Sequence, residues 1–406
     1  MKKLIQHVAL YQDHGVLEGQ NIAIDGSRIT GFPEAPKASD YDEVIDGKGM
    51  LALPGFVNTH NHVAMTVFRS YADDMQLMDW LEKKIWPAEA KLTDDVIYAQ
   101  SMLGIAEMIR CGTTAYADMY DHMDQEARAV EESGIRACLC RGSIGIGPNA
   151  QAGLDENRQL FLDWHGTADG RITVMMGPHA PYTCPPDYLH KFVDQARELG
   201  AEIHIHLSET KGEVENIKQQ YGKSPIALMD EIGVLDCGCL AAHCVWVDDD
   251  DMDIMAAKHV RVAHNPGSNL KLAIAPVPKM LAKGITVGLG TDGASSNNNL
   301  DIVEEMRLTT LIHKANTLDP LVIPAETAIN MLTEGGAKCL GYKDVGKLET
   351  GYKADITLVD REGLHWYPKN DTLSLMAYSA NSMDVDTVLV NGEVLLRHKE
   401  FTKLDI

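Results

Sequence analysis

The stretch Pro54-Gly55-Phe56-Val57-Asn58-Thr59-His60-Asn61-His62 joins an apolar run to two histidines spaced two residues apart. Side chains alternate between the two faces of a β-strand, so His60 and His62 would point the same way from a strand end. Imidazoles are common metal ligands, and two on one face can hold a metal ion together. The stretch therefore predicts a strand that delivers half of a metal site.

Short apolar runs alternate with amphipathic helical segments through the middle of the chain, for example around Val96–Arg110 and Pro186–Leu199. The eight strand candidates are Ala52–Asn58, Thr113–Asp118, Arg136–Arg141, Ile172–Gly177, Glu202–Leu207, Cys239–His243, Arg261–His264 and Thr286–Gly290. Eight such repeats over roughly 290 residues predict an α/β fold, a (β/α)8 TIM barrel. A doubly wound open sheet is the alternative, but no glycine-rich dinucleotide fingerprint follows the first strand.

Both chain ends have the pattern of a hairpin-rich sheet. The strand candidates there are Val16–Ile24 and Arg28–Phe32 around the hairpin dipeptide Asp25-Gly26, then Ala354–Val359 and Thr387–Val394. Neither end is large enough to bury a core alone. We therefore expect residues 1–53 and 346–406 to form one small β-sandwich domain, with the catalytic barrel, residues 54–345, inserted between them.

The chain has 406 residues, a net charge of −23 and a hydrophobic content of 45%, which is ample for a large core. The acidic surplus argues against nucleic acid as a partner, and no basic run suggests an anionic membrane surface. We expect neither a signal peptide nor a membrane span. The eight cysteines lack paired C-x-x-C spacing, so we expect buried reduced thiols and a cytoplasmic protein.

Histidines or an acid stand at the ends of six of the eight predicted strands. They are His60 and His62, His179, His206 with Ser208 and Glu209 after it, His243, His264 with Asn265, and Asp292. The carboxyl ends of barrel strands form the catalytic face. A lone histidine there is usually an ordinary hydrogen-bonded residue, but this shared placement predicts one common site.

The set His60, His62, His206 and Asp292 offers three imidazoles and one carboxylate, which suits zinc with a water as a further ligand. Such a water becomes hydroxide near neutral pH. His204 is a competing ligand, but it lies one pleat deeper, where we expect a packed core histidine. The fourth predicted strand has no lysine that could bridge two metals, so we expect a single ion.

Glu209 lies three residues after His206, in a loop that would cover the metal. A carboxyl group there can take a proton from the metal-bound water and deliver it to a substrate. The neutral interpretation is a solvated glutamate, since Lys211 and Glu213 follow it. His243 ends a strand with no other polar side chain, so it can contact the attacking hydroxide or serve a structural role.

Five motifs together resemble the amidohydrolase superfamily over nearly the whole chain. They are Pro54–His62, His179-Ala180-Pro181-Tyr182, His204-Ile205-His206-Leu207-Ser208-Glu209, Ala242-His243-Cys244 and Gly290-Thr291-Asp292-Gly293. Leu348–Ile356 continues the resemblance into the C-terminal region. The segments Met78–Glu82 and Ile85–Glu89 are similar to those of the 5-methylthioadenosine/S-adenosylhomocysteine deaminases.

The resemblance implies zinc-dependent hydrolytic deamination of the adenine ring of 5′-methylthioadenosine, S-adenosylhomocysteine or adenosine, with iron(II) or manganese(II) as other metals. Hydroxide would attack C6 and ammonia would leave. Asp292 would take a proton from the bound water, Glu209 would protonate the ring nitrogen beside C6, and His243 would steady the hydroxide. It also implies a small-molecule nucleoside partner and allows a homo-oligomer.

The resemblance further assigns residues to the substrate. Glu89 would accept hydrogen bonds from the ribose hydroxyls, although its sequence context is that of a surface glutamate. His179 and Arg141 would face the same pocket, and Trp80 would cover the adenine or the 5′ substituent unless it is a core tryptophan. Homologues that accept the homocysteine tail can use a further arginine after the third strand, where this chain has the neutral loop 145–150.

Two rival functions remain open from the sequence. The first is an aminohydrolase of the same superfamily that acts on guanine, a pterin or a triazine, in which Glu89 would have no ribose to bind. The second is a scaffold of the same fold without catalysis. Such a scaffold would be expected to lack ligands, whereas all four candidates are present.

Overall fold

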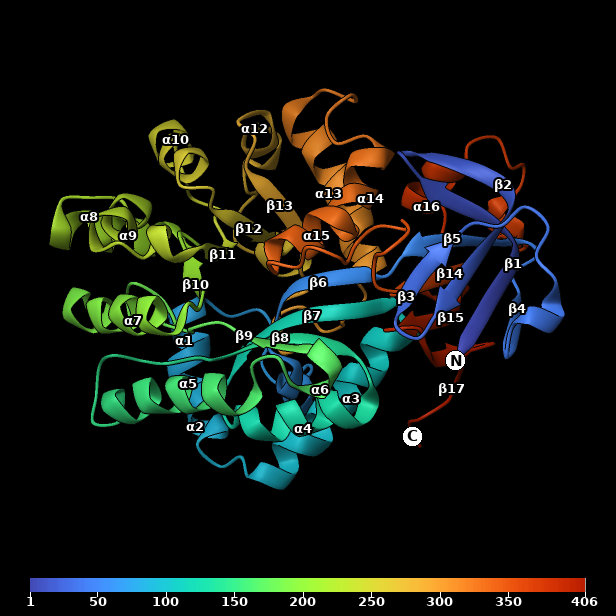
Figure 1. Cartoon of the computed structure of the whole chain (residues 1–406). Coiled ribbons are helices and arrows are strands. Elements are labelled where there is room, and N and C mark those ends of the chain that lie inside the picture. The colour runs from blue at the N-terminus through green and yellow to red at the C-terminus, as the bar shows by residue number, and fades with distance from the viewer. Residues whose placement is uncertain (406) are drawn as a thin grey trace.

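In the computed structural model, which describes residues 1–405, eight parallel strands form the centre of the fold (Figure 1). They form two four-stranded sheets, β6-β7-β8-β9 and β10-β11-β12-β13. Their bounds are β6 Phe56–Asn61, β7 Thr113–Tyr120, β8 Arg136–Arg141, β9 Ile172–Val174, β10 Ile203–Leu207, β11 Cys239–His243, β12 Arg261–His264 and β13 Thr286–Leu289. These strands are buried almost throughout, as a barrel covered by helices requires.

Two contacts close the sheets into a barrel. Met176 forms a parallel bridge with Ile203, which joins the end of the first sheet to β10. On the other side, the N–H of Asp292 donates to the carbonyl of His60 at 3.0 Å, where the chain leaving β13 meets β6. The TIM barrel predicted from the eight repeats is confirmed.

Helices surround the barrel (Figure 1). Those that connect or follow its strands are α3 Asp94–Arg110, α4 Met123–Ser133, α5 Ala150–Trp164, α6 Thr167–Gly170, α7 Pro186–Leu199, α8 Lys211–Tyr221, α9 Pro225–Ile232, α10 Asp249–Ala257, α11 Pro266–Asn269, α12 Val277–Ala282, α13 Ile302–Thr317, α14 Ala325–Leu332 and α15 Glu334–Cys339. Short helical turns are η2 Val63–Phe68, α1 Leu77–Trp80, η3 Leu81–Ile85, α2 Trp86–Glu89 and η4 Leu235–Cys237. The turns from α1 to α2 contribute side chains to the cavity at the barrel mouth.

The prediction of one first strand over Ala52–Asn58 is wrong. The chain forms β5, Met50–Pro54, which pairs with β1 and β14 in the other sheet, and then β6, which begins the barrel. Gly55 lies between the two strands. Thr114 leaves no room for a side chain at this position, since a Cβ atom would lie 2.1 Å from Thr114 Oγ1. Both strands are buried, so their sequences form one continuous apolar run. The hydrophobic pattern therefore does not show that the chain passes from one sheet to the other. The other seven predicted strands coincide with β7 to β13, and β9 ends early at Val174.

Strands from both chain ends form one nine-stranded sheet. Its strands are β1 Lys2–Gln12, β2 Gly15–Asp25, β3 Arg28–Gly31, β4 Glu43–Asp46, β5, β14 Ile356–Asp360, β15 Val385–Val390, β16 Glu393–Arg397 and β17 Glu400–Phe401. Residues such as Ile5, Ile24, Ile356 and Leu389 share one apolar core, so the sheet wraps around its own inner face. The helices η1 Ala38–Asp40, η5 Leu364–Trp366, α16 Thr372–Tyr378 and η6 Ser382–Asp384 complete this region.

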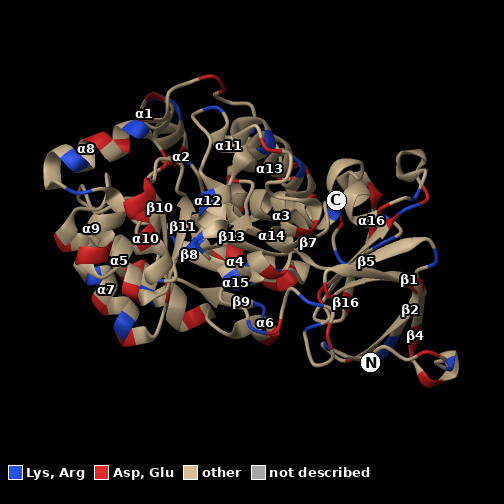
Figure 2. Cartoon of the chain, turned by 90° about the horizontal axis from the view of Figure 1, so that it is seen from above, with Lys and Arg blue, Asp and Glu red and all other residues tan. Residues whose placement is uncertain are grey.

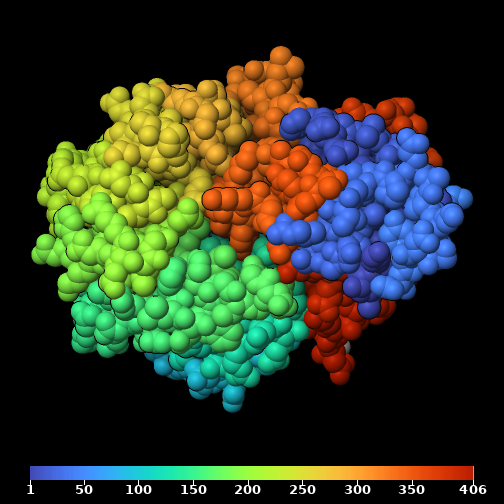
Figure 3. All heavy atoms as spheres, viewed as in Figure 1, coloured from blue at the N-terminus to red at the C-terminus, as the bar shows by residue number. Residues whose placement is uncertain are grey.

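The two chain ends lie against each other on one side of the molecule, as the adjoining blue and red atoms show (Figure 3). Their common sheet, with the barrel inserted between its halves, is the arrangement expected from the sequence. The boundaries at residues 53/54 and 345/346 remain a prediction.

Basic and acidic segments are interspersed around the molecule (Figure 2). Within residues 1–405, the helices are all too short or too polar to cross a bilayer. The eight cysteines are free thiols; seven are buried and Cys237 is half-buried. This agrees with the expectation of reduced, packed thiols.

Candidate metal centre and active site

Three histidines meet at the mouth of the barrel. His60 and His62 come from the end of β6, and His206 comes from β10. Their candidate ligand atoms all lie within 4.8 Å of one another. His60 is fully buried and His206 is 5% exposed, so water covers little of this cluster.

The Nδ1 atoms of two of these rings face carbonyl oxygens. His62 Nδ1 lies 2.5 Å from the carbonyl of Met119, and His206 Nδ1 lies 2.8 Å from the carbonyl of His179. A carbonyl only accepts hydrogen bonds, so each Nδ1 carries a proton and each Nε2 faces the cluster. Such outer hydrogen bonds orient histidines that ligate metals. The Nε2 of His60 has no hydrogen-bond partner among residues 1–405, although it is buried.

Asp292 adds a carboxylate to the histidine cluster from just beyond β13. Its Oδ1 lies 3.3 Å from His62 Nε2 and 3.7 Å from His60 Nε2, and its Oδ2 accepts a hydrogen bond from Ser268 Oγ at 2.8 Å. Burial acts to raise the pKa of Asp292, but the hydrogen bond and charge of His62 outweigh it and hold this pKa well below its usual range. Asp292 therefore stays ionised.

The strand ends place these groups through unusual backbone conformations. Ser208, His243 and Asp292 have φ values of +51°, +76° and +62°, a region that residues other than glycine rarely adopt. Conformations of this kind concentrate at functional sites, where the surrounding structure enforces them. Gly290 is required as well, because a Cβ there would lie 2.2 Å from Asn265 Oδ1 and 2.9 Å from the backbone nitrogen of His60.

These residues fit a divalent metal ion. Imidazole nitrogens of three histidines and one ionised carboxylate converge, and one of the nitrogens, His60 Nε2, is buried without a hydrogen-bond partner among the described residues. This donor set is typical of hydrolytic zinc sites. Nε2 of His204 faces Nδ1 of His60 at 3.0 Å, so the former competing ligand lies behind the cluster.

Glu209 and His243 form the second half of the site. Their side chains, together with Asp292, bring candidate ligand atoms within 4.8 Å of one another. His243 Nε2 lies 3.7 Å from Glu209 Oε1. The amide nitrogens of Asn265 and Asn269 lie 3.1 Å from His243 Nδ1, nearer than the amide oxygen of Asn269 at 3.3 Å. Since an amide nitrogen only donates, these two nearer contacts favour Nδ1 as the acceptor and place the proton of His243 on Nε2, facing Glu209.

The loop that carries Glu209 is held by a second glutamate. Glu213, at the start of α8, accepts the N–H of Ser208 at 2.8 Å and that of Glu209 at 2.9 Å. Burial raises the pKa of the Glu209 carboxyl group. Glu209 is 7% exposed, so the solvated loop glutamate considered from the sequence is not what the structure contains.

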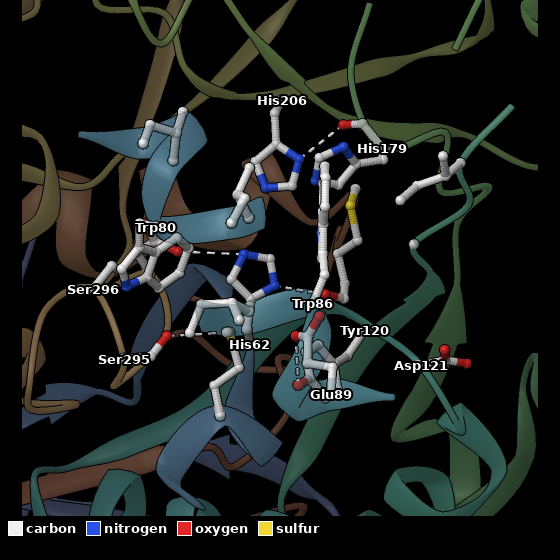
Figure 4. Close-up of a pocket in the computed structure, with 18 of the residues that line it drawn as sticks. His62, Trp80, Trp86, Glu89, Tyr120, Asp121, His179, His206, Ser295 and Ser296 are labelled. Carbon is white, nitrogen blue, oxygen red and sulfur yellow. Dashed lines mark hydrogen bonds and ion pairs between the residues drawn. The ribbon is translucent and has the colours of Figure 1, made fainter. Parts of the chain in front are cut away.

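A cavity of about 570 Å³ opens above the cluster. It is lined by all six substrate-binding candidates from the sequence, which are Trp80, Glu89, Arg141, His179, Glu209 and Asp292. In the view of Figure 4, the indole rings of Trp80 and Trp86 stand on either side of His62.

Glu89 lies in this cavity from the end of α2, and Tyr120 Oη donates to its Oε1 at 2.7 Å (Figure 4). The interpretation of Glu89 as an ordinary surface residue is therefore wrong. Burial raises the pKa of this carboxyl group, whereas the hydrogen bond from Tyr120 lowers it. His179 Nδ1 lies 2.9 Å from Thr183 Oγ1, and its pKa falls to about 4 because it is buried, so its ring is neutral.

Arg141 reaches the cavity with its charge already paired. Its Nε donates to Glu156 Oε2 at 2.6 Å, its Nη2 lies 3.0 Å from Asp121 Oδ1, and its Nη1 donates to the carbonyl of Gly142. The guanidinium is thus held at the rim by two acids, one of which, Asp121, also lines the cavity.

Sequence reasoning missed three residues of this site: Trp86, Tyr120 and Ser268. Trp86 could have been found, because it precedes Glu89 by three residues in a helical segment and therefore shares its face. Tyr120 was missed because β7 extends two residues beyond the end of the predicted strand. Nothing in the sequence pattern marks Ser268. His264, in contrast, does not join the cluster, because its Nε2 faces that of His313 at 3.3 Å.

The barrel and its histidine–aspartate cluster define a hydrolase with a divalent-metal centre. The family model for the amidohydrolases matches residues 51–395. A 5-methylthioadenosine/S-adenosylhomocysteine deaminase of Dictyoglomus turgidum is 50% identical over 407 aligned positions, which cover 100% of this chain and 96% of the relative. The chain belongs to the amidohydrolase family and is a metal-dependent aminohydrolase.

Solved structures of this fold carry zinc. A zinc-bound adenosine deaminase of Xanthomonas campestris is 30% identical with a TM-score of 0.93, over 99% of this chain and 94% of that one. A zinc-bound atrazine chlorohydrolase of Arthrobacter aurescens is 25% identical with a TM-score of 0.92, over 99% and 97% of the two chains. These two names imply different substrates on one fold. The substrate of this chain therefore has to be inferred from the residues that line its cavity.

Proposed function

We propose that this protein uses zinc to deaminate the adenine ring of 5′-substituted adenosines, namely 5′-methylthioadenosine, S-adenosylhomocysteine or adenosine, to the inosine analogue and ammonia. The observation that carries the proposal is the placement of Glu89 in the same cavity as His62 and His206. Relatives that are 50–52% identical in sequence and are named 5-methylthioadenosine/S-adenosylhomocysteine deaminases support the proposal.

Glu89 is suited to a ribose. Tyr120 occupies Oε1 of Glu89, which fixes the carboxyl group and leaves Oε2 available for the sugar hydroxyls. A cavity of this size holds a nucleoside with a small 5′ substituent. Trp80 and Trp86 supply flat apolar surfaces against which a purine can pack.

The two carboxyl groups beside the cluster suit opposite roles. Asp292 is held ionised and can accept a proton, whereas burial lets Glu209 keep one and deliver it. Environments that push two pKa values apart in this way assign the base and the acid. Glu209 would donate to the ring nitrogen beside C6, which makes C6 more electrophilic.

His60, His62, His206 and Asp292 would hold a divalent metal, whose chemistry would be to lower the pKa of water so that hydroxide is available near neutral pH. His243 presents Nε2–H toward Glu209 and stabilises negative charge that develops on the oxygen added at C6. The buried cluster excludes bulk water, so these hydrogen bonds act in a low dielectric.

A deamination assay over adenosine, 5′-methylthioadenosine, S-adenosylhomocysteine, adenine, guanine and cytosine tests the proposal. We expect turnover of the adenine nucleosides. Turnover of a free base but of none of the nucleosides would contradict it and would favour the guanine, pterin or triazine rival. We also expect stoichiometric zinc in the purified protein by elemental analysis.

Glu89→Gln separates the nucleoside hypothesis from that rival. Hydrogen bonds to a charged group contribute about 1.5–3 kcal/mol, so KM for nucleosides should rise about 10- to 100-fold. Glu82→Gln is the matched control, since Glu82 is exposed in the same helical segment. An unchanged KM in the Glu89 variant would mean that no ribose is bound there.

A further inference from the structure

Among the three cluster histidines, the ring of His60 is held in a different way from the other two. The Nδ1 atoms of His62 and His206 face backbone carbonyls, which fix the position of the proton. The Nδ1 of His60 instead faces another imidazole, Nε2 of His204, at 3.0 Å. An imidazole nitrogen can donate or accept, so this contact alone does not fix which nitrogen of His60 is bare.

Cys140, which contacts the other ring nitrogen of His204, determines the direction of the hydrogen bond between His204 and His60. Cys140 Sγ lies 3.6 Å from His204 Nδ1 and donates to the backbone carbonyl of Asp118 at 3.3 Å. Burial raises the pKa of the Cys140 thiol well above its ordinary value, so the sulfur keeps its hydrogen. The thiol hydrogen points at the carbonyl, and the sulfur lone pairs are left to accept from His204.

A single arrangement of hydrogens satisfies this chain of contacts. The thiol of Cys140 donates to a carbonyl, Nδ1–H of His204 donates to the sulfur, and Nδ1–H of His60 donates to Nε2 of His204. The Nε2 of His60 is then bare, which agrees with its lack of a hydrogen-bond partner among the described residues. In the reverse arrangement, Nε2 of His60 would carry a hydrogen and could not bind a metal.

We propose that His204 and Cys140 are positioning residues that lock His60 in the tautomer whose Nε2 is free to bind the metal. This inference rests on the proposed metal-binding role of His60. His204 is 1% exposed and Cys140 is fully buried, so water does not replace either partner. Neither side chain lines the cavity, so neither contacts the substrate.

The test is the dissociation constant for zinc, measured on metal-free protein by competition with a chromophoric chelator. His204→Leu removes the acceptor for His60 and should weaken zinc binding by about 10- to 100-fold, the range for lost outer-sphere partners. His204→Gln places an amide oxygen where Nε2 stood, so it should restore most of the affinity. A merely structural role would not distinguish the two variants in this way.

Variants of the neighbouring cysteine provide an independent test. Cys140→Val removes the acceptor for His204 with little change in volume, and it should weaken zinc binding. Cys140→Ser keeps a group that donates and accepts, and its affinity should stay near that of the wild type. His313→Leu is the matched control, because it removes a buried imidazole that contacts His264 rather than the cluster.

The outcomes separate this inference from the proposed function. Zinc binding by His204→Leu or Cys140→Val as tight as in the wild type would overturn the inference, while leaving deamination intact. A loss in His204→Gln as large as in His204→Leu would also overturn it. Failure of the wild type to bind zinc would contradict the proposed function instead. Thermal unfolding of each metal-free variant establishes that it is folded, and the cysteine variants decide the question if His204→Leu is not.

Discussion

At the scale of single residues, the proposed mechanism has one carboxyl group accept a proton and another donate one. Asp292 is held ionised by His62, while Glu209 is buried beside His243 with its pKa raised. Both lie within the same small group of candidate ligand atoms, so the roles differ through hydrogen bonds rather than through distance from the cluster. This difference can be tested by replacing one carboxyl group at a time.

Glu209→Gln should lower kcat for 5′-methylthioadenosine by about 10²- to 10⁴-fold, the usual contribution of a general acid. The amide has the shape of the carboxyl group but has no acidic proton to deliver. Zinc content, measured by elemental analysis, should stay at the wild-type value because Glu209 is not among the proposed ligands. A kcat close to that of the wild type would remove Glu209 from the mechanism.

We expect Arg141 to affect how the cavity accommodates a negatively charged 5′ substituent. Glu156 and Asp121 pair with it, so a substrate carboxylate has to compete with two acids already present. Glu156→Gln should therefore raise kcat/KM for S-adenosylhomocysteine relative to 5′-methylthioadenosine. An exposed ion pair contributes up to about 1 kcal/mol, so we expect an increase of up to about fivefold.

The control for this prediction is an ion pair between the same helix, α5, and helix α7. Arg158 of α5 pairs with Glu198 of α7 on the surface, outside the cavity. Glu198→Gln should leave the ratio of the two kcat/KM values unchanged. An equal ratio in wild type and Glu156→Gln would show that Arg141 does not limit recognition of the tail.

At the scale of elements, strand β7 and helix α4 share a buried carboxyl pair. Tyr116 Oη donates to Glu126 Oε1 at 2.8 Å, whereas Glu126 Oε2 and Asp118 Oδ1 are buried without a hydrogen-bond partner among the described residues. Burial raises the pKa of Glu126 to about 8 and that of Asp118 well above its usual range, so the pair holds at least one proton near neutral pH. Asp118 also accepts the N–H of Val63, directly after His62, which ties this pair to the end of β6.

This pair makes stability depend on pH. The folded pKa of Glu126 lies above the value of about 4.3 in an unfolded chain, so its stabilisation is complete at low pH and is lost as the pH rises toward 8. Glu126→Gln supplies a permanent N–H for Asp118 and should remove this slope, which is at most about 1.4 kcal/mol per pH unit. The variant should have the higher Tm at pH 9.

Thermal unfolding between pH 5 and 9 measures the effect. Glu131→Gln on the exposed face of α4 is the control and should follow the wild type at every pH. If the Tm of the wild type and that of Glu126→Gln fall equally as the pH rises, the pair does not hold a proton.

Local pattern at this scale predicted most strands but not the change of sheet at Gly55. Both β5 and β6 are buried, and periodicity does not report which neighbours a buried strand has. The break depends on Thr114 in another strand, which approaches Gly55 too closely for any side chain.

At the scale of the whole molecule, a buried ion pair joins the barrel to the sheet formed by the chain ends. Arg136 of β8 donates through Nε and Nη2 to both oxygens of Asp355, just before β14, at 2.8 and 3.1 Å. Both side chains are about 2% exposed or less. The pair therefore depends on the packing of two regions that are far apart in the sequence.

Asp355→Ala should reduce the free energy of unfolding by about 3–5 kcal/mol, because it leaves the Arg136 charge buried without a partner. Urea unfolding followed by circular dichroism measures the loss. Asp344→Ala breaks an exposed ion pair with Arg28 and should cost less than about 1 kcal/mol. Equal midpoints for the two variants would contradict this account.

The sequence by itself determined the barrel, the sheet shared by the chain ends and the polar residues at the strand ends. These features follow from local periodicity and from the rule that carboxyl ends of parallel strands meet on one face. The strand-end histidines and acids were therefore found before any packing was known.

Only the tertiary structure decided which nitrogen atoms are bare, which acid holds a proton and what surrounds the cavity. The tautomer of His60 depends on His204 and Cys140. Whether the guanidinium of Arg141 is free to bind a substrate carboxylate depends on its ion pairs with Glu156 and Asp121. Hydrogen-bond direction and desolvation arise from neighbours on other strands, and no single strand carries that information. His60 and His62 mark a metal site in the sequence, but their partners across the barrel determine its chemistry.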